Sequence, residues 1–386
     1  MTSATSDTAL APRDTSDVCD IVRESASLRR SLRIVGAGTW LDAGRAVRGA
    51  THLSLSSLSD IVEYVPGDLT LTARAGTPLS EIVRLTSANG QWLPLDPFGD
   101  PGATLGATLA TASCGPLAGT MGRPRDVALG LALVTGEGNH VQGGGRVVKN
   151  VAGFDLVRLN VGAWGTLGVI TEATVRLRAL PACDSTVALA APTDMSSLHA
   201  LIVSMRNALL TPMAMELVSA SLASRIGRPP NSVILVRIAG NEESMRAQRA
   251  TLSSLGPVAD VDTSIWDRLR ATEPARSATF RISRRPSELA ALWSRSLDVL
   301  ATHEDALLHA NVERGVVRAI LPESAPSDLS FTLMQLRQSG SLIGERLPEA
   351  CWASLGADFS NALAHSARRA FDPAGILNPG IVAPAP

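Results

Sequence analysis

Residues 94–122 read PLDPFGDPGATLGATLATASCGPLAGTMG, and the interpretation of the rest of the chain follows from them. The run from Gly102 to Gly122 has no charged residue and consists mostly of glycine, alanine, serine and threonine. A membrane helix would be richer in leucine, and Pro116 interrupts the run, so a small-residue core helix or a ligand cradle fits better. We favour the cradle, because Gly102 and Gly106 would admit a ligand to the backbone. A helix N-terminus with free N–H groups attracts an anion such as a diphosphate.

This run and the motifs before and after it occur in the same order as in the FAD-binding domain of vanillyl-alcohol oxidase-type (PCMH-type) flavoproteins, which they resemble. Among these flavoproteins, the chain is most similar to the FAD-binding subunits of bacterial glycolate oxidases. Residues 100–107, DPGATLGA, follow the family's DPG-x-x-TLGG loop, with alanine at 107 in place of the second glycine. The resemblance runs from about Leu32 to Pro181 and resumes in Phe371–Gly380. It implies an α+β fold, in which a two-subdomain PCMH-type FAD-binding domain is followed by an α+β cap domain.

The resemblance also implies which residues hold a non-covalently bound FAD. Glycines of the first loop would form a backbone nest for the diphosphate, and the C-terminal motif would lie near the isoalloxazine ring. The implied cofactor-binding residues are Gly36, Ala37, Gly38, Thr39, Trp40, Gly102, Ala103, Thr104, Leu105, Gly106, Thr108, Ser113, Gly115, Asp126, Gly168, Val169, Ile170 and Asn378. Without the resemblance, the first loop is also compatible with an ordinary tight turn, Asp126 with a solvated surface carboxylate and Asn378 with an Asx-turn residue.

The sequence does not match two other nucleotide-binding motifs. A Rossmann fingerprint would need a third glycine where Leu41 stands, and no helical run with an acidic ribose partner follows. The glycines at 143–145 lack the Lys-Ser/Thr ending of a Walker loop, which argues against a nucleoside triphosphatase. Residues 149–156, KNVAGFDL, instead resemble the family's KN-x-AGYDL motif, with Phe154 where tyrosine is usual.

The composition fits a two-domain protein of 386 residues with a sizeable core. A net charge of −1 gives no reason to expect nucleic-acid binding or attraction to an anionic membrane. The four cysteines are far apart in sequence, which suits a reducing compartment. The N-terminus does not resemble a secretory signal. We therefore expect a cytoplasmic protein with no membrane span, associated with a membrane only through partners.

The predicted organisation has four parts. Residues 1–17 form a flexible tail, 18–181 the FAD-binding domain, 182–365 the cap domain, and 366–386 a segment that returns to the flavin domain. In the first domain, the pattern predicts a helix at 18–28 and strands at 33–35, 61–65, 69–75, 127–134 and 169–177. Thr77 is predicted to cap a helix that buries Leu79, Ile82 and Val83.

The sequence indicates the cofactor more clearly than it indicates the residues that would catalyse a reaction. FAD would carry the redox step, but none of the six histidines forms an HxH or HExxH pair, no metal site is complete and no catalytic residue can be assigned. His309-Ala310-Asn311 is either a remnant of the family's histidine-bearing segment or contains an ordinary core or surface histidine. The resemblance implies an FAD-dependent oxidoreductase acting on the CH–OH group of glycolate or a related 2-hydroxy acid, as the FAD-binding subunit of a complex with a larger flavin subunit and an iron–sulfur subunit.

Three alternatives remain open at this point. The chain could be a non-catalytic, flavin-binding assembly subunit, since the histidine cluster of the large catalytic relatives is missing. It could be a stand-alone FAD-linked oxidoreductase such as a D-lactate dehydrogenase. A reductase of cell-wall precursors on the same flavin fold is the weakest of the three.

Overall fold

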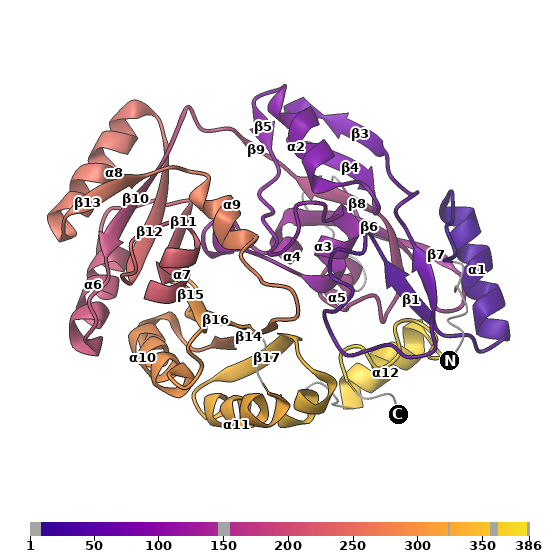
Figure 1. The fold of residues 1–386 in the computed structure, drawn as a ribbon. Coiled ribbons are helices and arrows are strands. Elements are labelled where there is room, and N and C mark those ends of the chain that lie inside the picture. The colour runs from indigo at the N-terminus through magenta and orange to yellow at the C-terminus, as the bar shows by residue number, and fades with distance from the viewer. Residues whose placement is uncertain (1–8, 146–154, 323–324, 356–361, 384–386) are drawn as a thin grey trace. The chain divides into compact units, whose positions relative to one another are not determined.

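The computed structural model describes residues 9–145, 155–322, 325–355 and 362–383 (Figure 1). The chain divides into two compact units. Unit 1 comprises Met1–Cys114, Gly122–Leu180 and Asp358–Pro386, and unit 2 comprises Gly115–Met121 and Pro181–Ala357. The described residues 362–383 belong to unit 1, and the uncharged run is shared between both units. The mixture of helices with two mainly antiparallel sheets confirms the expected α+β class.

Unit 1 begins with a small parallel sheet. Strands β1 (Leu32–Val35) and β2 (Thr51–Ser54) pair in parallel, and helix α1 (Thr15–Ser27) starts where Asp14 accepts a hydrogen bond from Asp17 N. Leu10 N donates to His52 O at 2.8 Å, so the chain is already held at residue 10. The expected tail up to residue 17 was therefore too long, because one backbone pairing and one helix cap tie it down.

The second sheet of unit 1 is antiparallel and has the strand order β3-β4-β8-β6-β7. Its three central strands are mostly buried, whereas the two edge strands, β3 and β7, contain no fully buried residue. The strands are β3 (Ile61–Val65), β4 (Thr70–Arg74), β6 (Ala128–Val134), β7 (His140–Gly144) and β8 (Val169–Arg176). Shorter elements of this unit are η1 (Pro66–Asp68), α2 (Leu79–Ser87), β5 (Gln91–Trp92), α3 (Leu105–Thr111), α4 (Pro124–Val127), α5 (Leu156–Asn160) and β9 (Arg178–Ala179).

The start of α2 differs from the prediction. Pro78 occupies the cap position without a side-chain bond, while the Thr77 hydroxyl donates to Asp60 O and accepts from Asp60 N, both at 3.0 Å. Thr77 thus joins α2 to the segment before β3 instead of capping the helix. Leu79 and Ile82 are buried as expected, but Val83 is exposed, because the buried face of a helix this short covers little more than one stripe.

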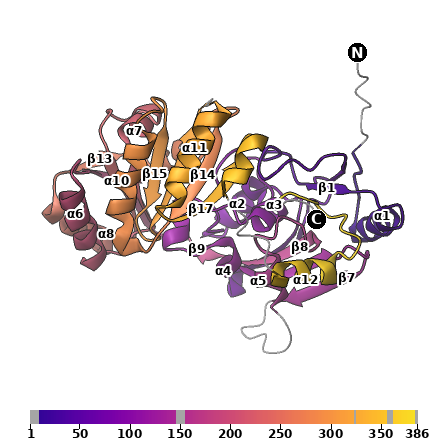
Figure 2. The ribbon, with the colours of Figure 1, turned by 90° about the horizontal axis from the view of Figure 1, so that it is seen from below.

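Unit 2 is built on an eight-stranded antiparallel sheet with the order β13-β10-β12-β11-β15-β16-β14-β17. Helices α6, α8, α10 and α11 bury their apolar sides in one continuous core with this sheet, and Figure 2 shows α10 and α11 along it. The strands are β10 (Cys183–Ala190), β11 (Ala214–Val218), β12 (Val233–Gly240), β13 (Val258–Val261), β14 (Ala278–Ser283), β15 (Leu307–Asn311), β16 (Val316–Leu321) and β17 (Ser341–Arg346). The helices are η2 (Pro116–Gly119), α6 (Met195–Asn207), α7 (Ala220–Arg225), α8 (Glu242–Leu255), α9 (Ile265–Arg270), η3 (Pro286–Glu288), α10 (Leu289–Leu300), α11 (Pro326–Arg337) and η4 (Glu349–Leu355).

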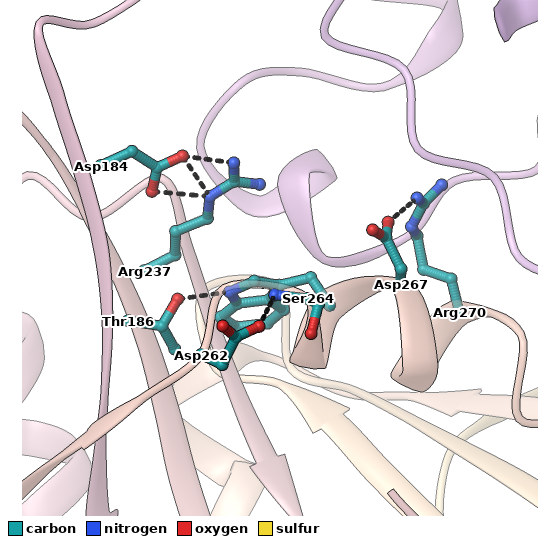
Figure 3. Close-up of polar contacts among 8 residues, drawn as sticks. Asp184, Thr186, Arg237, Asp262, Ser264, Asp267 and Arg270 are labelled. Atoms are coloured by element: carbon teal, nitrogen blue, oxygen red, sulfur yellow. Dashed lines mark hydrogen bonds and ion pairs between the residues drawn. The ribbon is translucent and has the colours of Figure 1, made fainter.

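Helix α9 is fastened to strand β10 of unit 2 by a buried side-chain bond. Trp266 Nε1 donates to the Thr186 hydroxyl at 2.8 Å (Figure 3). On the same strand, Asp184 accepts a forked bond from Arg237 of β12, with Nε 3.0 Å from Oδ1. These contacts order one end of the sheet, and they involve none of the residues predicted from the sequence to bind a cofactor.

The C-terminal segment completes unit 1. After α12 (Ala362–Phe371), Phe371 O accepts from Gly136 N at 2.8 Å, and Leu377 lies beside Leu32 in a parallel bridge. In both ribbon views α12 lies near β7 (Figures 1 and 2). None of the described helices is both long and apolar enough to cross a membrane.

Candidate cofactor-binding site

A pocket of about 730 Å³, part of it open to solvent, lies within unit 1. The loop after β1, one side of α3, the turn at 164–168 and the C-terminal segment line it together. Ten of the residues proposed from the sequence are among its lining: Gly36, Ala37, Gly38, Thr39, Trp40, Thr104, Gly106, Gly168, Ile170 and Asn378. The sequence motifs thus converge on one cavity although they lie up to 342 residues apart in the chain.

The loop after β1 offers free backbone donors to this pocket. The N–H groups of Ala37, Gly38 and Thr39 donate no hydrogen bond within the described part of the chain. Gly38 adopts φ +76°, the left-handed conformation that turns successive N–H groups inward. Consecutive N–H groups of this kind form an anion nest, so this loop suits a diphosphate.

Gly36 is required because the loop lies against the start of α3. A Cβ atom at this position would lie 2.4 Å from Thr104 Oγ1, which no side chain permits. Thr104 Oγ1 itself is buried and has no hydrogen-bond partner among the described residues. A buried hydroxyl without a partner beside a pocket is a donor that a polar ligand can use.

The start of α3 does not provide the free N–H groups that the sequence suggested. Leu105 N donates to Thr77 O at 2.9 Å and Gly106 N donates to Ala75 O at 2.8 Å. A Cβ on Gly106 would lie 2.5 Å from Ala75 Cβ, so this glycine permits close packing of α3 against the end of β4. The expectation that Gly106 admits the diphosphate to the backbone is therefore wrong in its reason, although Gly106 lines the pocket.

Several other candidates in the uncharged run do not line this pocket. Leu105 is fully buried in the core, and the Thr108 hydroxyl donates to Thr104 O at 2.9 Å within the helix. Gly102 N is taken by Asp100 Oδ1 at 2.7 Å in a tight turn that precedes α3. The remaining candidates of the run outside the lining are Ala103, Ser113 and Gly115.

Three candidates lie elsewhere for clear physical reasons. Val169 is a core residue of β8, and Gly115 belongs to unit 2. Asp126 accepts from Arg123 N at 3.0 Å and from the Arg123 guanidinium at 3.4 Å, in the first turn of α4. Partial burial raises the pKa of Asp126, but these bonds outweigh it and hold the pKa below its ordinary value. Asp126 thus stabilises a helix start, and the pocket lining does not include it.

Asn378 joins two walls of the pocket. Its Oδ1 accepts from Ile34 N at 2.8 Å, and its Nδ2 donates to Trp164 O at 2.7 Å. Its own backbone N donates to Leu32 O at 2.9 Å, and its φ is +44°, a conformation that asparagine tolerates better than most residues. The side chain therefore positions backbone from two distant parts of the chain, which neither a ring contact nor an Asx-turn would require.

Eleven further lining residues were not among the sequence candidates, and four of them add to the character of the pocket. Ala107, Ala110 and Thr111 form the pocket side of α3, at the i, i+3 and i+4 spacing of one helix face. Arg33 is the one charged residue of the lining within the described chain, and its Nη2 lies 3.4 Å from Leu41 O. Burial lowers the pKa of Arg33, yet an arginine stays protonated at neutral pH. The alternation of β1 could have placed Arg33, whereas the α3 face needed the helix boundary.

Unit 2 contains a second cluster of buried polar groups. Glu216 accepts from His309 Nδ1 and from Asn311 Nδ2, each at 2.8 Å, and Asn311 Nδ2 also donates to Pro116 O at 3.1 Å. Arg318, which pairs with His309 across β15 and β16, binds Glu345 at 2.8 Å. These partners come from strands far apart in sequence, and no three of the described His, Cys, Asp and Glu side chains could hold a metal ion together.

The same cluster continues to Glu273, which binds both Arg318 and Arg346. His309 is 3% exposed and paired with a carboxylate, which fits the interpretation of a core histidine. The motif at residues 149–154 lies outside the described residues, so its expected role stays untested.

Comparison with known families agrees with the geometry of the pocket. Residues 6–144 match the family described as FAD binding domain. The chain carries a PCMH-type FAD-binding domain. FAD is accordingly its cofactor. The matched range includes the nest at residues 37–39 and the α3 helix, whereas the lining residues at 164–170 and 378 lie outside it.

Several curated proteins are similar in sequence to part of this chain. Glycolate oxidase subunit GlcE of Escherichia coli is 41% identical over 162 residues, which are 42% of this chain and 46% of that protein. Glycolate oxidase subunit GlcD of Bacillus subtilis is 26% identical over 87% of this chain and 72% of its own length. The mitochondrial D-lactate dehydrogenase [cytochrome] of Arabidopsis thaliana is 31% identical over 45% of this chain and 31% of its own. Most of these matches therefore cover less than half of the relative.

Solved structures extend the likeness in fold to nearly the whole chain. A crystal structure of p-cresol methylhydroxylase with substrate bound superimposes with a TM-score of 0.78 at 15% identity, over 98% of this chain and 88% of that one. An alkyldihydroxyacetonephosphate synthase gives a TM-score of 0.70 at 16% identity, over 95% and 76%. At such identities the likeness establishes the fold of the FAD-binding domain and of unit 2.

The residues present fit FAD. The nest at 37–39 and the Arg33 guanidinium provide donors and one positive charge for a diphosphate. Alanines 107 and 110 and the indoles of Trp40 and Trp164 provide apolar surface for planar rings. Thr104 Oγ1 adds a buried hydroxyl whose hydrogen-bonding capacity is otherwise unused within the described structure.

Proposed function

We propose that this chain is the FAD-binding subunit of a glycolate oxidase-like 2-hydroxy-acid dehydrogenase complex, in which it supports electron transfer from glycolate or a related 2-hydroxy acid. The observation that carries the proposal is the pocket of unit 1, and a match of 162 residues at 41% identity to a glycolate oxidase subunit supports it. The proposed partners are a larger flavin subunit and an iron–sulfur subunit. We expect the complex in the cytoplasm, with any membrane association through those partners.

The chain's own residues would bind and orient the cofactor. Bound FAD supplies the capacity to accept electrons from a hydroxy acid or from a neighbouring redox centre. The N–H groups at 37–39 and Arg33 would hold its diphosphate, while Asn378 keeps β1 and the turn at Trp164 at a fixed separation. Such positioning needs no proton transfer by the protein.

No catalytic base is assigned among the residues that the structure describes, which supports a role within a complex. Oxidation of a hydroxyl needs a group that accepts its proton, and a positioned base contributes roughly a hundred- to ten-thousand-fold to the rate. His309, the histidine of the motif singled out in the sequence, is buried against Glu216. A subunit that binds FAD and relays electrons would not need this base.

The test compares the purified chain with the co-expressed complex, using glycolate and D-lactate with an artificial electron acceptor. We expect the chain alone to retain FAD and to turn over both acids at least about a hundred-fold more slowly than the complex. Equal turnover by the chain alone would contradict the partner model. It would favour the second candidate, a stand-alone dehydrogenase, for which the 31% match to a D-lactate dehydrogenase speaks.

A further inference from the structure

Two tryptophans face each other at the wall of the pocket in unit 1. The rings of Trp40 and Trp164 are stacked, with centroids 6.2 Å apart and planes inclined by 13°. Both line the pocket, and both are partly exposed. The rest of the lining consists mainly of glycine, alanine, threonine and small aliphatic residues. The pair is therefore the large flat surface of this cavity.

Trp164 holds its place at a cost in backbone conformation. Its φ is +56°, a left-handed value that costs a non-glycine residue about 1–2 kcal/mol and is rare for a bulky side chain. Glycines occur on both sides of it at 162 and 165, with φ +86° and +68°. A position that only had to turn the chain would be served better by a third glycine. The strained tryptophan thus points to a use for its indole.

Fixed hydrogen bonds enforce this conformation. Trp164 N donates to Ala110 O at 2.8 Å on α3, and Trp164 O accepts from Asn378 Nδ2 at 2.7 Å. An edge atom of the indole also lies close to Gly44, since a Cβ built there would lie 3.1 Å from Trp164 Cζ3. The backbone that carries the indole is consequently fixed from two sides before any ligand arrives.

We infer that Trp40 and Trp164 form a preorganised aromatic wall against which a planar ring of bound FAD, either the adenine or the isoalloxazine, packs. The inference rests on FAD binding by unit 1, and it adds a ring-recognition element to the backbone contacts for the diphosphate. Stacking of a heteroaromatic ring on an indole is favourable for either ring, since both present a π face. Preorganisation avoids the entropy loss of ordering the side chains at binding.

The test uses variants of Trp164 in the full-length protein freed of flavin. Trp164→Gly removes the indole and suits the left-handed backbone, so it should fold, as far-ultraviolet circular dichroism and thermal melting would verify. We expect FAD to bind about ten-fold more weakly to this variant and normally to Trp164→Phe, which keeps a ring. Trp40→Leu removes the other indole of the aromatic wall and provides a second, independent test. Trp92→Phe, which alters the other tryptophan of unit 1, should leave binding unchanged.

Tryptophan fluorescence gives a readout that does not depend on activity. FAD should quench the wild-type emission, and the quenching assigned to Trp164 should disappear in Trp164→Gly but not in Trp92→Phe. Titrations with ADP and with riboflavin identify the ring, because the variant should weaken only the ligand that carries it. Unchanged FAD affinity in both Trp164→Gly and Trp40→Leu would overturn the aromatic wall. A wild-type protein that binds no FAD would overturn FAD binding as well, so the two failures are distinguishable.

Discussion

Asn378 donates from Nδ2 to Trp164 O at 2.7 Å, across a sequence separation of 214 residues. Through the same side chain, Ile34 N is bonded at 2.8 Å. One amide therefore fixes the separation between the strand that leads into the nest and the turn that carries the aromatic wall. Few single residues of unit 1 join so many parts of the pocket.

Replacing Asn378 by alanine should destabilise unit 1 by about 2–4 kcal/mol, because it leaves Ile34 N and Trp164 O without their partner and puts alanine at positive φ. Urea unfolding of the variant would measure this, and FAD binding should weaken in parallel. Asn378→Asp retains the acceptor for Ile34 N and should lose less. A loss no larger than about 0.5 kcal/mol in Asn378→Ala would show that water replaces the amide.

Replacing Gly106 by alanine should lower stability before it affects any ligand. The new Cβ would lie 2.5 Å from Ala75 Cβ and 2.9 Å from Ala75 O, so α3 must shift from β4 at a cost of about 1–3 kcal/mol. Thermal melting of the flavin-free protein measures this cost. Gly67→Ala is the matched control, since nothing lies within 4 Å of its Cβ. Full stability of Gly106→Ala together with lost FAD binding would restore the direct cofactor role that the sequence suggested.

FAD should be released intact when the protein is denatured. The described pocket lining contains no histidine, cysteine or tyrosine to which a flavin could be joined covalently. Acid or heat precipitation followed by chromatography of the supernatant should recover FAD in full. Flavin that remains with the precipitated chain would mean that a residue outside this lining forms a covalent bond.

Acid should weaken unit 2 through Glu345. Burial alone would raise the pKa of this carboxyl, but the guanidinium groups of Arg318 and Arg281 outweigh it and hold the pKa below the ordinary 4.5. A carboxylate with a lowered folded-state pKa contributes stability that is present above 4.5 and is lost as the pH falls through the folded value.

Urea unfolding between pH 7 and pH 3 tests the contribution of Glu345. Glu345→Gln should be less stable than the wild type at pH 7. Below pH 4.5 its free energy of unfolding should fall less steeply with pH than that of the wild type, and the two slopes should differ by up to about 1.4 kcal/mol per pH unit. Glu304→Gln changes an exposed glutamate and should keep the wild-type slope. Parallel slopes in the wild type and Glu345→Gln would rule out this carboxylate as the source of acid sensitivity.

The parts of the fold that local pattern controls were predictable. The strands at 61–65 and 128–134 follow from runs of β-formers between turns, and the loop after β1 follows from its glycines. Each of these features depends on residues within about ten positions. Ten of the residues that the family resemblance implied line one pocket in the structure.

The features that the sequence analysis did not predict depend on contacts between residues that are distant in sequence. Nothing near Gly106 indicates that its N–H bonds to Ala75 O, because the docking of α3 on β4 decides it. The pairing of Glu216 with His309 requires the register of β11 and β15, which is set by the whole eight-stranded sheet. The uncharged run, which Pro116 interrupts, gave no sign that Gly115–Met121 belongs to the other unit.

The position of Asn378 has a consequence for how the protein is made. Unit 1 is interrupted by Pro181–Ala357, so its sheet leaves the ribosome long before the segment that closes the pocket. At roughly 5–20 residues per second, those 177 residues take on the order of 10 to 35 seconds to synthesise. During that interval Ile34 N and Trp164 O lack their common partner, and the nascent unit exposes an unfinished binding site. Closure of the pocket by Asn378 therefore follows the synthesis of Pro181–Ala357, however early the glycine loops fold.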